Sequence, residues 1–243
     1  MKIGIYIDAA NLAYSGGFNM RYDVLKDFCS IGGGELVRLN TYISYDAQKA
    51  EQDKEYREKQ DSYFRIVRHF GFKILRKDVK WYTNEEGERY GKANADLDLA
   101  VDMLIQSRNL DKVFLLSGDG DFKRVVKAVQ DKGVRVELIA FNNISGDLIS
   151  ECDHYIPGFI IPDLLPIKHP GKNGERYRGI CYNVEDKFSF LRYINADFGY
   201  EEVFAHLSEL RNNKNFYLDR IYEFSVDEGP KGPVAKRIVE VKF

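Results

Sequence analysis

Two carboxylates separated by a single glycine are the most distinctive chemical group in the sequence. Asp119 and Asp121 come just after residues 113–117, a run with the composition of a buried strand in which only Ser117 is polar, and Gly118 separates them from it. The carboxyl ends of strands form the edge at which open α/β sheets bind their ligands. A helix cap accounts for Asp121, because a helical pattern begins after it, but leaves Asp119 unexplained. For this pair to take part in chemistry, other carboxylates have to reach the same edge.

Two further aspartates meet that condition. Asp8 closes the apolar run of residues 2–8, so it also stands at the carboxyl end of a strand. Asp96 lies in the first turn of a helix predicted over residues 94–107, where a helical projection places it within the apolar arc and opposite Asp98. That arc consists of Leu99, Ala100, Met103 and Leu104. A carboxylate on the buried face of a helix needs a partner, which the helix amino terminus and a metal ion can supply.

Asp8, Asp96, Asp119 and Asp121, gathered at one edge, would hold a hard divalent cation. Like charges at short range repel each other unless a cation lies among them, and oxygen ligands without His or Cys favour Mg²⁺ or Mn²⁺ over Zn²⁺. Such an ion polarises a phosphate oxygen and activates a bound water, which is the chemistry of phosphodiester hydrolysis. Asn11, three residues after Asp8, would orient the phosphate or the water. Taken singly, each aspartate is better explained as a helix or turn cap.

Strand and helix patterns alternate along the first two thirds of the chain. Strands are also predicted at residues 36–44, 72–75, 134–141 and 155–160, and helices at 22–30, 51–70, 122–132 and 143–151. This order predicts an α/β fold with a parallel, doubly wound sheet between two layers of helices. Residues 77–92, which place Trp81 and Tyr82 among lysines, predict a hairpin or a loop over the site. Its aromatic residues can stack on bases or simply pack the hairpin.

The sequence pattern changes in the last third of the chain. Residues 161–176 predict a linker, because they lack periodicity and contain Pro162, Pro166, Pro170, Gly171 and Gly174. Short strand patterns with turn signals follow, and they predict a small five-stranded barrel. The expected domains are therefore residues 1–160 and 177–243, joined by that linker.

The amino-acid composition limits which binding partners and which cellular compartment can be expected for the protein. The 243 residues are 44% hydrophobic and 30% charged with a formal net charge of -2, so any nucleic-acid contact has to be local. Cys29, Cys152 and Cys181 are odd in number and far apart, which indicates neither a disulfide framework nor a zinc knuckle. No apolar run approaches the roughly 18 residues of a membrane span, and no signal peptide precedes the first strand. We expect a cytoplasmic protein without a membrane partner, and the sequence leaves its oligomeric state open, a homodimer included.

Three segments of the first domain resemble the signatures of the NYN branch of PIN-like nucleases. They are residues 7–11 (IDAAN), residues 92–104 (KANADLDLAVDML) and residues 117–122 (SGDGDF), in that order. The resemblance implies an α/β/α sandwich that hydrolyses RNA with Mg²⁺ or Mn²⁺. The residues that it implies are Asp8, Asp96 and Asp119 as metal ligands, Asp121 as ligand or water-positioning group, Asn11 as support, and Asp102, Ser117 and Lys92 as residues around the ligands or near the phosphate.

Three segments of the second domain resemble a cold-shock domain, an OB-fold barrel that binds single strands. They are residues 186–191 (DKFSFL), 203–208 (VFAHLS) and 229–233 (GPKGP). Lys187 and Ser189 replace glycines of the usual first motif, and Cys181 stands about where an aromatic is expected, with Tyr182 beside it. The resemblance implies a base-stacking platform for single-stranded RNA made by Tyr182, Phe188, Phe190, Phe204 and His206. Packing in the barrel core is the alternative explanation for some of these side chains.

Three hypotheses follow from these observations. The leading one is a metal-dependent ribonuclease whose barrel binds single-stranded RNA, structured RNA being a further possible substrate. The second is a protein that binds RNA without cleaving it, in which the aspartates hold a structural ion or none. The third is a phosphatase of the haloacid-dehalogenase type or a phosphoacceptor of the receiver type. Ala10 disfavours the phosphatase, because it occupies the position of the second acid in the Asp-x-Asp pair that this type needs.

Overall fold

The computed structural model describes residues 1–167 and 176–242, which form two compact units. The first unit contains residues 1–18 and 29–156, and the second contains residues 19–28 and the chain from residue 157 onward. Among the described residues, no helix is both long and apolar enough to cross a bilayer.

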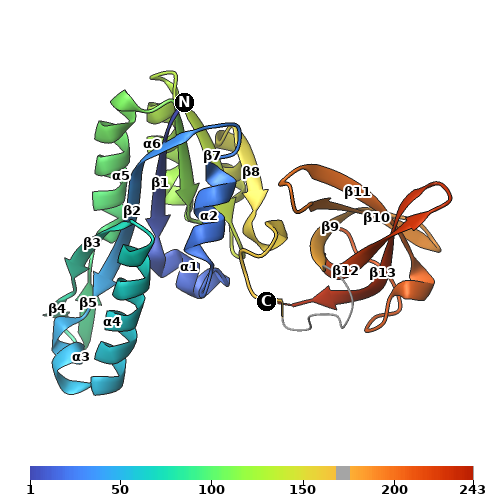
Figure 1. Cartoon of the computed structure of the whole chain (residues 1–243). Coiled ribbons are helices and arrows are strands. Elements are labelled where there is room, and N and C mark those ends of the chain that lie inside the picture. The colour runs from blue at the N-terminus through green and yellow to red at the C-terminus, as the bar shows by residue number, and fades with distance from the viewer. Residues whose placement is uncertain (168–175, 243) are drawn as a thin grey trace. The chain divides into compact units, whose positions relative to one another are not determined.

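A six-stranded sheet with helices packed on it forms the first unit (Figure 1). The strand order is β3-β2-β1-β6-β7-β8, and the β1–β2, β1–β6, β2–β3 and β6–β7 pairs are all parallel. The predicted α/β sandwich is therefore confirmed. The strands are β1 (Lys2–Asp8), β2 (Glu35–Tyr45), β3 (Lys73–Asp78), β6 (Lys112–Leu116), β7 (Arg135–Ala140) and β8 (His154–Pro157). Because β1 lies between β2 and β6, the chain changes direction across the sheet at β1, where doubly wound folds place ligands.

The helices differ from the predicted ones at two places. Residues 9–15, for which no helix was predicted, form a helix because Asp8 caps their start and Gly16 ends it with a φ of 100°. The helix expected at 51–70 is two helices, because Asp53 adopts extended backbone angles and accepts a hydrogen bond from the Tyr56 amide. The helices are α1 (Ala9–Ser15), α2 (Tyr22–Cys29), α3 (Ala47–Gln52), α4 (Lys54–His69), α5 (Ala95–Gln106), α6 (Lys123–Gln130) and α7 (Gly146–Glu151).

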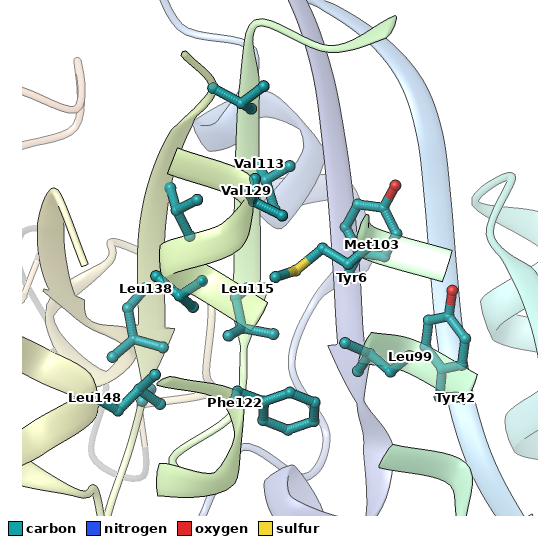
Figure 2. Close-up of a cluster of buried hydrophobic side chains, with 14 of the residues drawn as sticks. Tyr6, Tyr42, Leu99, Met103, Val113, Leu115, Phe122, Val129, Leu138 and Leu148 are labelled. Carbon is teal, nitrogen blue, oxygen red and sulfur yellow. The ribbon is translucent and has the colours of Figure 1, made fainter. Parts of the chain in front are cut away.

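The core of the first unit lies between the sheet and helices α5 and α6. Leu99 and Met103 project from α5 onto Tyr6 of β1 and Leu115 of β6, and all four side chains are fully buried (Figure 2). Phe122, which precedes α6, fills the same cluster near the carboxyl ends of the strands. This packing fixes the amino terminus of α5 next to the edge where β1 and β6 end.

The predicted hairpin is present, outside the main sheet. Strands β4 (Lys80–Thr83) and β5 (Arg89–Lys92) pair antiparallel as a separate two-stranded sheet. Each of these eight residues is exposed, so the hairpin contributes little to the core.

A closed five-stranded barrel forms most of the second unit, as the sequence predicts. Its strand order is β10-β11-β13-β12-β9, with a parallel contact between β11 and β13. Alternate residues such as Leu191, Val203 and Phe224 fill the interior. This closed Greek-key arrangement is consistent with an OB-type, cold-shock-like fold. The strands are β9 (Tyr177–Val184), β10 (Phe188–Ile194), β11 (Tyr200–His206), β12 (Ile221–Gly229) and β13 (Gly232–Val241).

Part of the predicted linker packs on this unit. Residues 168–175, which contain most of the expected linker's second half, lie outside the described residues. Before them, Leu164 and Leu165 are buried, and the Arg178 guanidinium of β9 donates to the carbonyls of Leu165 at 3.3 Å and Pro166 at 2.8 Å. The same guanidinium pairs with Glu223 at 2.9 Å, with both side chains almost completely buried.

We predict that Glu223→Gln strongly destabilises the barrel. The change leaves the buried Arg178 charge without its anion, a loss typically worth about 3–5 kcal/mol of unfolding free energy. The control is Glu202→Gln, which breaks the exposed pair between Arg192 and Glu202 and should leave the unfolding midpoint nearly unchanged. Urea unfolding of the full chain, followed by circular dichroism, measures both effects. Equal midpoints for the two variants would contradict the prediction.

Candidate functional site

Asp8 lies buried where β1 becomes α1. Its side chain is 4% exposed and accepts hydrogen bonds from the Asn11 amide and the Ser117 hydroxyl, each at 3.0 Å. Burial raises the pKa of Asp8 above its usual value, and the two hydrogen bonds partly oppose that shift because they stabilise the charged form. The Asp119 charge raises the pKa further. Ser117 therefore supports Asp8 directly, across the pairing of β1 with β6.

The loop after β6 is held close to Asp8 by hydrogen bonds. The Gly118 amide donates to Asn11 Oδ1 at 2.9 Å, and the Asp119 amide donates to Ser117 Oγ at 3.1 Å. Asp119 Oδ1 in turn accepts from the Asp121 amide at 3.0 Å and caps a single turn of 3-10 helix, Gly120–Phe122. Asp119 is half-buried and Asp121 is exposed. The predicted cap at this turn is thus made by Asp119 rather than by Asp121.

Asp96 joins this group from the start of α5, but in a different way from the one predicted. Its side chain is exposed, so its expected place on the buried face is wrong, and Leu104 of the expected apolar arc is exposed as well. The pKa of Asp96 is nevertheless raised to about 6, first by partial loss of hydration and then by the charges of Asp8, Asp119 and Asp121. Acids from three separate segments are therefore close enough to repel one another.

This group of oxygen atoms fits a hard divalent cation in its chemistry. Carboxylates are the ligands that Mg²⁺ and Mn²⁺ prefer, and the shifts at Asp8 and Asp96 have no Lys or Arg among their main causes. In the part of the chain that the structure describes, however, no three His, Cys, Asp or Glu side chains are already arranged as a metal-binding group.

Asp102 lies in a separate polar network that holds α5 on the sheet. It accepts a hydrogen bond from the Tyr42 hydroxyl at 2.9 Å, and Asn40 donates to that hydroxyl and to Gln106 at 3.2 and 3.1 Å. The Tyr6 hydroxyl completes the network by donating to Gln106 at 3.0 Å. Asp102 thus positions the helix that carries Asp96, and is not among the charges that raise its pKa.

The hairpin residues combine exposure with packing. Trp81 is 38% exposed, donates its indole N–H to Asp46 at 3.3 Å, and carries the Arg89 guanidinium 4.8 Å from its ring centre. Tyr82 stacks on Tyr90 of the opposite strand with ring centres 5.8 Å apart. Lys92 ends this hairpin and is exposed opposite Lys80. Trp81 and Tyr82 therefore both pack on neighbouring side chains, and Lys92 is not among the charges that shift the pKa of Asp8 or Asp96.

The aromatic residues of the barrel lie together on its outer surface. Phe190 pairs with Phe204 and Phe188 with His206 across β10 and β11, while the intervening Ser189 and Ala205 point inward. Neighbouring ring centres lie 5.4 to 6.4 Å apart. We call this surface the barrel aromatic face, and it consists of Tyr182, Phe188, Phe190, Phe204 and His206.

Two of the three departures from the cold-shock motif, Cys181 and Ser189, have a structural reason, whereas Lys187 is exposed. Cys181 is buried and lies 3.0 Å from the Ser189 hydroxyl, so both substituted positions face the barrel interior. Tyr182 points outward beside Phe190 and lies under the Arg192 guanidinium, 4.8 Å from the ring centre. Tyr182 therefore supplies the aromatic ring that Cys181 lacks.

Two features near the site were not predicted from the sequence. They are the contact of the loop after β7 with the segment that carries Asp119, and the exposed ring of Tyr14. A Cβ atom at Gly118 would lie 3.0 Å from the Asn143 carbonyl, and one at Gly120 would lie 2.8 Å from the Ser145 hydroxyl. This loop therefore presses against both glycines, and only the capping serine before α7 could have indicated its position. Tyr14, one helical turn beyond Asn11, is 89% exposed and has no sequence signal of its own.

We predict that Asp96→Asn stabilises the metal-free protein at neutral pH. The raised pKa means that the folded chain binds the Asp96 proton more tightly than the unfolded chain, so the stability from this group is present below about pH 4 and is lost as the pH rises through about 6. Because the side chain is exposed and screened, the gain should be at most about 1 kcal/mol at pH 7.5. Urea unfolding with a chelator, at pH 7.5 and pH 4, measures it. Asp98→Asn, which only breaks the pair with Lys77, should show no pH-dependent gain.

Comparisons with known proteins agree with this fold. The family model described as the NYN domain matches residues 2–164. Over 162 residues, the chain is 30% identical to the low amplitude and bright protein LabA of Synechococcus elongatus, a match that covers 64% of this chain and 82% of LabA. The structure of VPA0982 from Vibrio parahaemolyticus, a protein of unknown function, superposes with a TM-score of 0.50 at 23% identity, over 64% of this chain and 91% of that one.

A further match among solved structures is more distant. The structure named drosophila Unr CSD456 aligns with 29% of this chain and 28% of its own at 21% identity, with a TM-score of 0.25. The family match shows which family the chain belongs to, and it includes the segments with Asp8, Asp96, Asp119 and Asp121. The chain belongs to the NYN domain family, within the PIN-like nuclease superfamily, which supports a nuclease type of reaction.

Proposed function

We propose that this protein is a metal-dependent ribonuclease. The observation that carries the proposal is the raised pKa of Asp96, because its cause includes the charges of Asp8, Asp119 and Asp121 from two other segments. Strongly perturbed carboxylates that converge at a ligand-binding edge of a sheet are typical of catalytic sites. Family membership points to the same type of reaction.

Asp8, Asp96 and Asp119 are the residues that would hold Mg²⁺ or Mn²⁺. When bound, such an ion supplies a Lewis acid for the phosphate and lowers the pKa of a coordinated water. Asp121 is exposed to solvent, so we assign it the role of orienting the attacking water or accepting its proton. Asn11 acts as a positioning residue, because its side chain fixes the Gly118 amide and thereby the loop that carries Asp119.

The barrel aromatic face is the surface that we assign to single-stranded RNA. Unpaired bases stack on exposed aromatic rings, each stack contributing about 1–3 kcal/mol, and such stacking tolerates many sequences. The five rings form a connected set on β9, β10 and β11 rather than a core cluster. Arg192, beside Tyr182, adds a cation at the edge of this surface.

A second candidate function is RNA binding without cleavage. The observation that favours it is the barrel aromatic face, because its five rings lie outside the core and can bind bases without any metal ion. In that case the barrel aromatic face would account for the activity, and the aspartates would hold a structural ion or none. The two candidates differ in whether RNA is hydrolysed when Mn²⁺ is supplied.

We predict that the protein cleaves single-stranded RNA with Mg²⁺ or Mn²⁺ and that Asp119→Asn lowers the rate by at least about 100-fold. The loss of an anionic ligand weakens the charge stabilisation that the site provides. Gel analysis of an end-labelled RNA measures the rate, with and without chelator. The matched control is Asp98→Asn on α5, which should retain activity because Asp98 pairs with Lys77 outside the site. Equal rates in wild type and Asp119→Asn would reject the ribonuclease proposal.

We also predict that Phe190→Ala and Phe204→Ala each weaken binding of single-stranded RNA by about 5-fold to 150-fold, since each removes one ring of about 1–3 kcal/mol. Fluorescence anisotropy with a labelled oligonucleotide, in chelator to prevent cleavage, measures the dissociation constant. Tyr217→Ala is the control, because Tyr217 is 48% exposed but lies outside the barrel aromatic face. If the control and the two variants bind equally well, the barrel aromatic face is not the RNA-binding surface.

A further inference from the structure

Helix α5 is apolar on two opposite sides. Ala95, Leu99 and Met103 face the core and are buried. On the other side, four large apolar residues are exposed, and their spacing places them on one face of the helix. We call them the outer stripe: Leu97 (59% exposed), Val101 (45%), Leu104 (36%) and Ile105 (57%).

The outer stripe is more than a scatter of surface residues. Single exposed apolar side chains are normal, but side chains at i, i+4, i+7 and i+8 lie in one continuous row along a helix. A helix that is apolar on both sides is typically covered on both sides, and a contiguous apolar patch indicates an interaction surface. A polyanion such as RNA does not fit this row, because the row offers it neither cations nor aromatic rings.

The charges at the two ends of the outer stripe have opposite signs. Asp96 and Asp98 occupy the first turn of α5. Asp98 is half-buried and pairs with Lys77 at 2.9 Å, so this end of the helix keeps an acidic balance through Asp96. At the other end, Arg108 is exposed in the turn that follows the helix. The Lys132 ammonium also reaches this end, where it donates to the Leu104 carbonyl and, at 3.3 Å, to the Ser107 hydroxyl.

We propose that the outer stripe is the interface at which this chain pairs with a second copy of itself, with the two α5 helices antiparallel. In that orientation the acidic end of each helix faces the basic end of the other, and the two helix dipoles oppose each other favourably. A parallel arrangement would instead bring like charges together. The same patch on both copies is what an interface with two-fold symmetry requires.

The length of the stripe sets the register and the strength of the contact. With the two-fold axis near Val101, Leu97 of one copy packs against Ile105 of the other, and Asp98 approaches Arg108. The twelve residues of α5 extend only about 18 Å, so one helix pair covers less than the roughly 1,200–2,000 Å² of a standard interface. The dimer is therefore a weak one, with a dissociation constant on the order of micromolar.

Sedimentation analysis of the full chain between about 1 and 100 µM tests the proposal. The wild type should change from monomer to dimer over this range, and Val101→Glu should remain monomeric because it places two carboxylates at the centre of the interface. The matched control is Ile66→Glu on α4, which introduces the same charge at a residue of similar exposure, 50%, and should dimerise like the wild type. Circular dichroism checks that each variant is folded. A wild type that stays monomeric at every concentration overturns the proposal.

A charge exchange tests the antiparallel orientation. Arg108→Asp and Asp98→Arg should each weaken dimerisation by about 10-fold, since each brings like charges together across the interface. The double variant restores both opposite-charge contacts and should recover most of the wild-type dissociation constant. Additive weakening in the double variant would overturn the antiparallel arrangement, whichever result the RNA cleavage assay gives.

Discussion

Repulsion among carboxylates is the constraint on which the first unit depends, because parallel pairing of β1 with β6 brings Asp8 and Asp119 to one edge of the sheet. Hydrogen bonds moderate that repulsion: Ser117 and the Asn11 amide donate to Asp8, and the Asp121 amide donates to Asp119. Within the described residues, no such hydrogen bond offsets the charge of Asp96, whose pKa is raised first by partial loss of hydration and then by its acidic neighbours. The remaining electrostatic cost is what a bound cation would relieve.

Holding α5 in place is the second requirement of this arrangement. Its apolar side packs on the sheet through Leu99 and Met103, and its polar side is fixed through Asp102, whose partner is the buried Tyr42 hydroxyl. Burial and the hydrogen bond to Asp102 both raise the pKa of Tyr42, so this hydroxyl stays protonated and remains a donor. Asp102 therefore contributes to the site through the position of the helix rather than through its own charge.

The sequence predicts the sheet, the barrel and most of the converging acids, because Asp8 and Asp119 directly follow long apolar runs. It misplaces Asp96 for a physical reason: α5 is apolar on two sides, and a helical projection cannot tell the core-facing residues from the outer stripe. The role of Asp102 depends on Tyr42, which lies 60 positions away in the chain. The position of the loop after β7 could not be predicted either, because its contact with Gly118 joins residues that are far apart in the sequence. Alternation did separate Ser189 from Phe188 and Phe190, because strand geometry alone determines which residues face outward.

The two glycines around Asp119 carry a consequence for evolutionary change. Every possible replacement adds at least a Cβ atom, which at Gly118 would meet the backbone of residues 143–144 and at Gly120 the side chain of Ser145. Asn can replace Asp119 or Asp121 with almost no change of volume. If the proposed hydrolysis were lost, Asn could therefore replace either acid more easily than any larger residue could replace Gly118, whose neighbour is backbone.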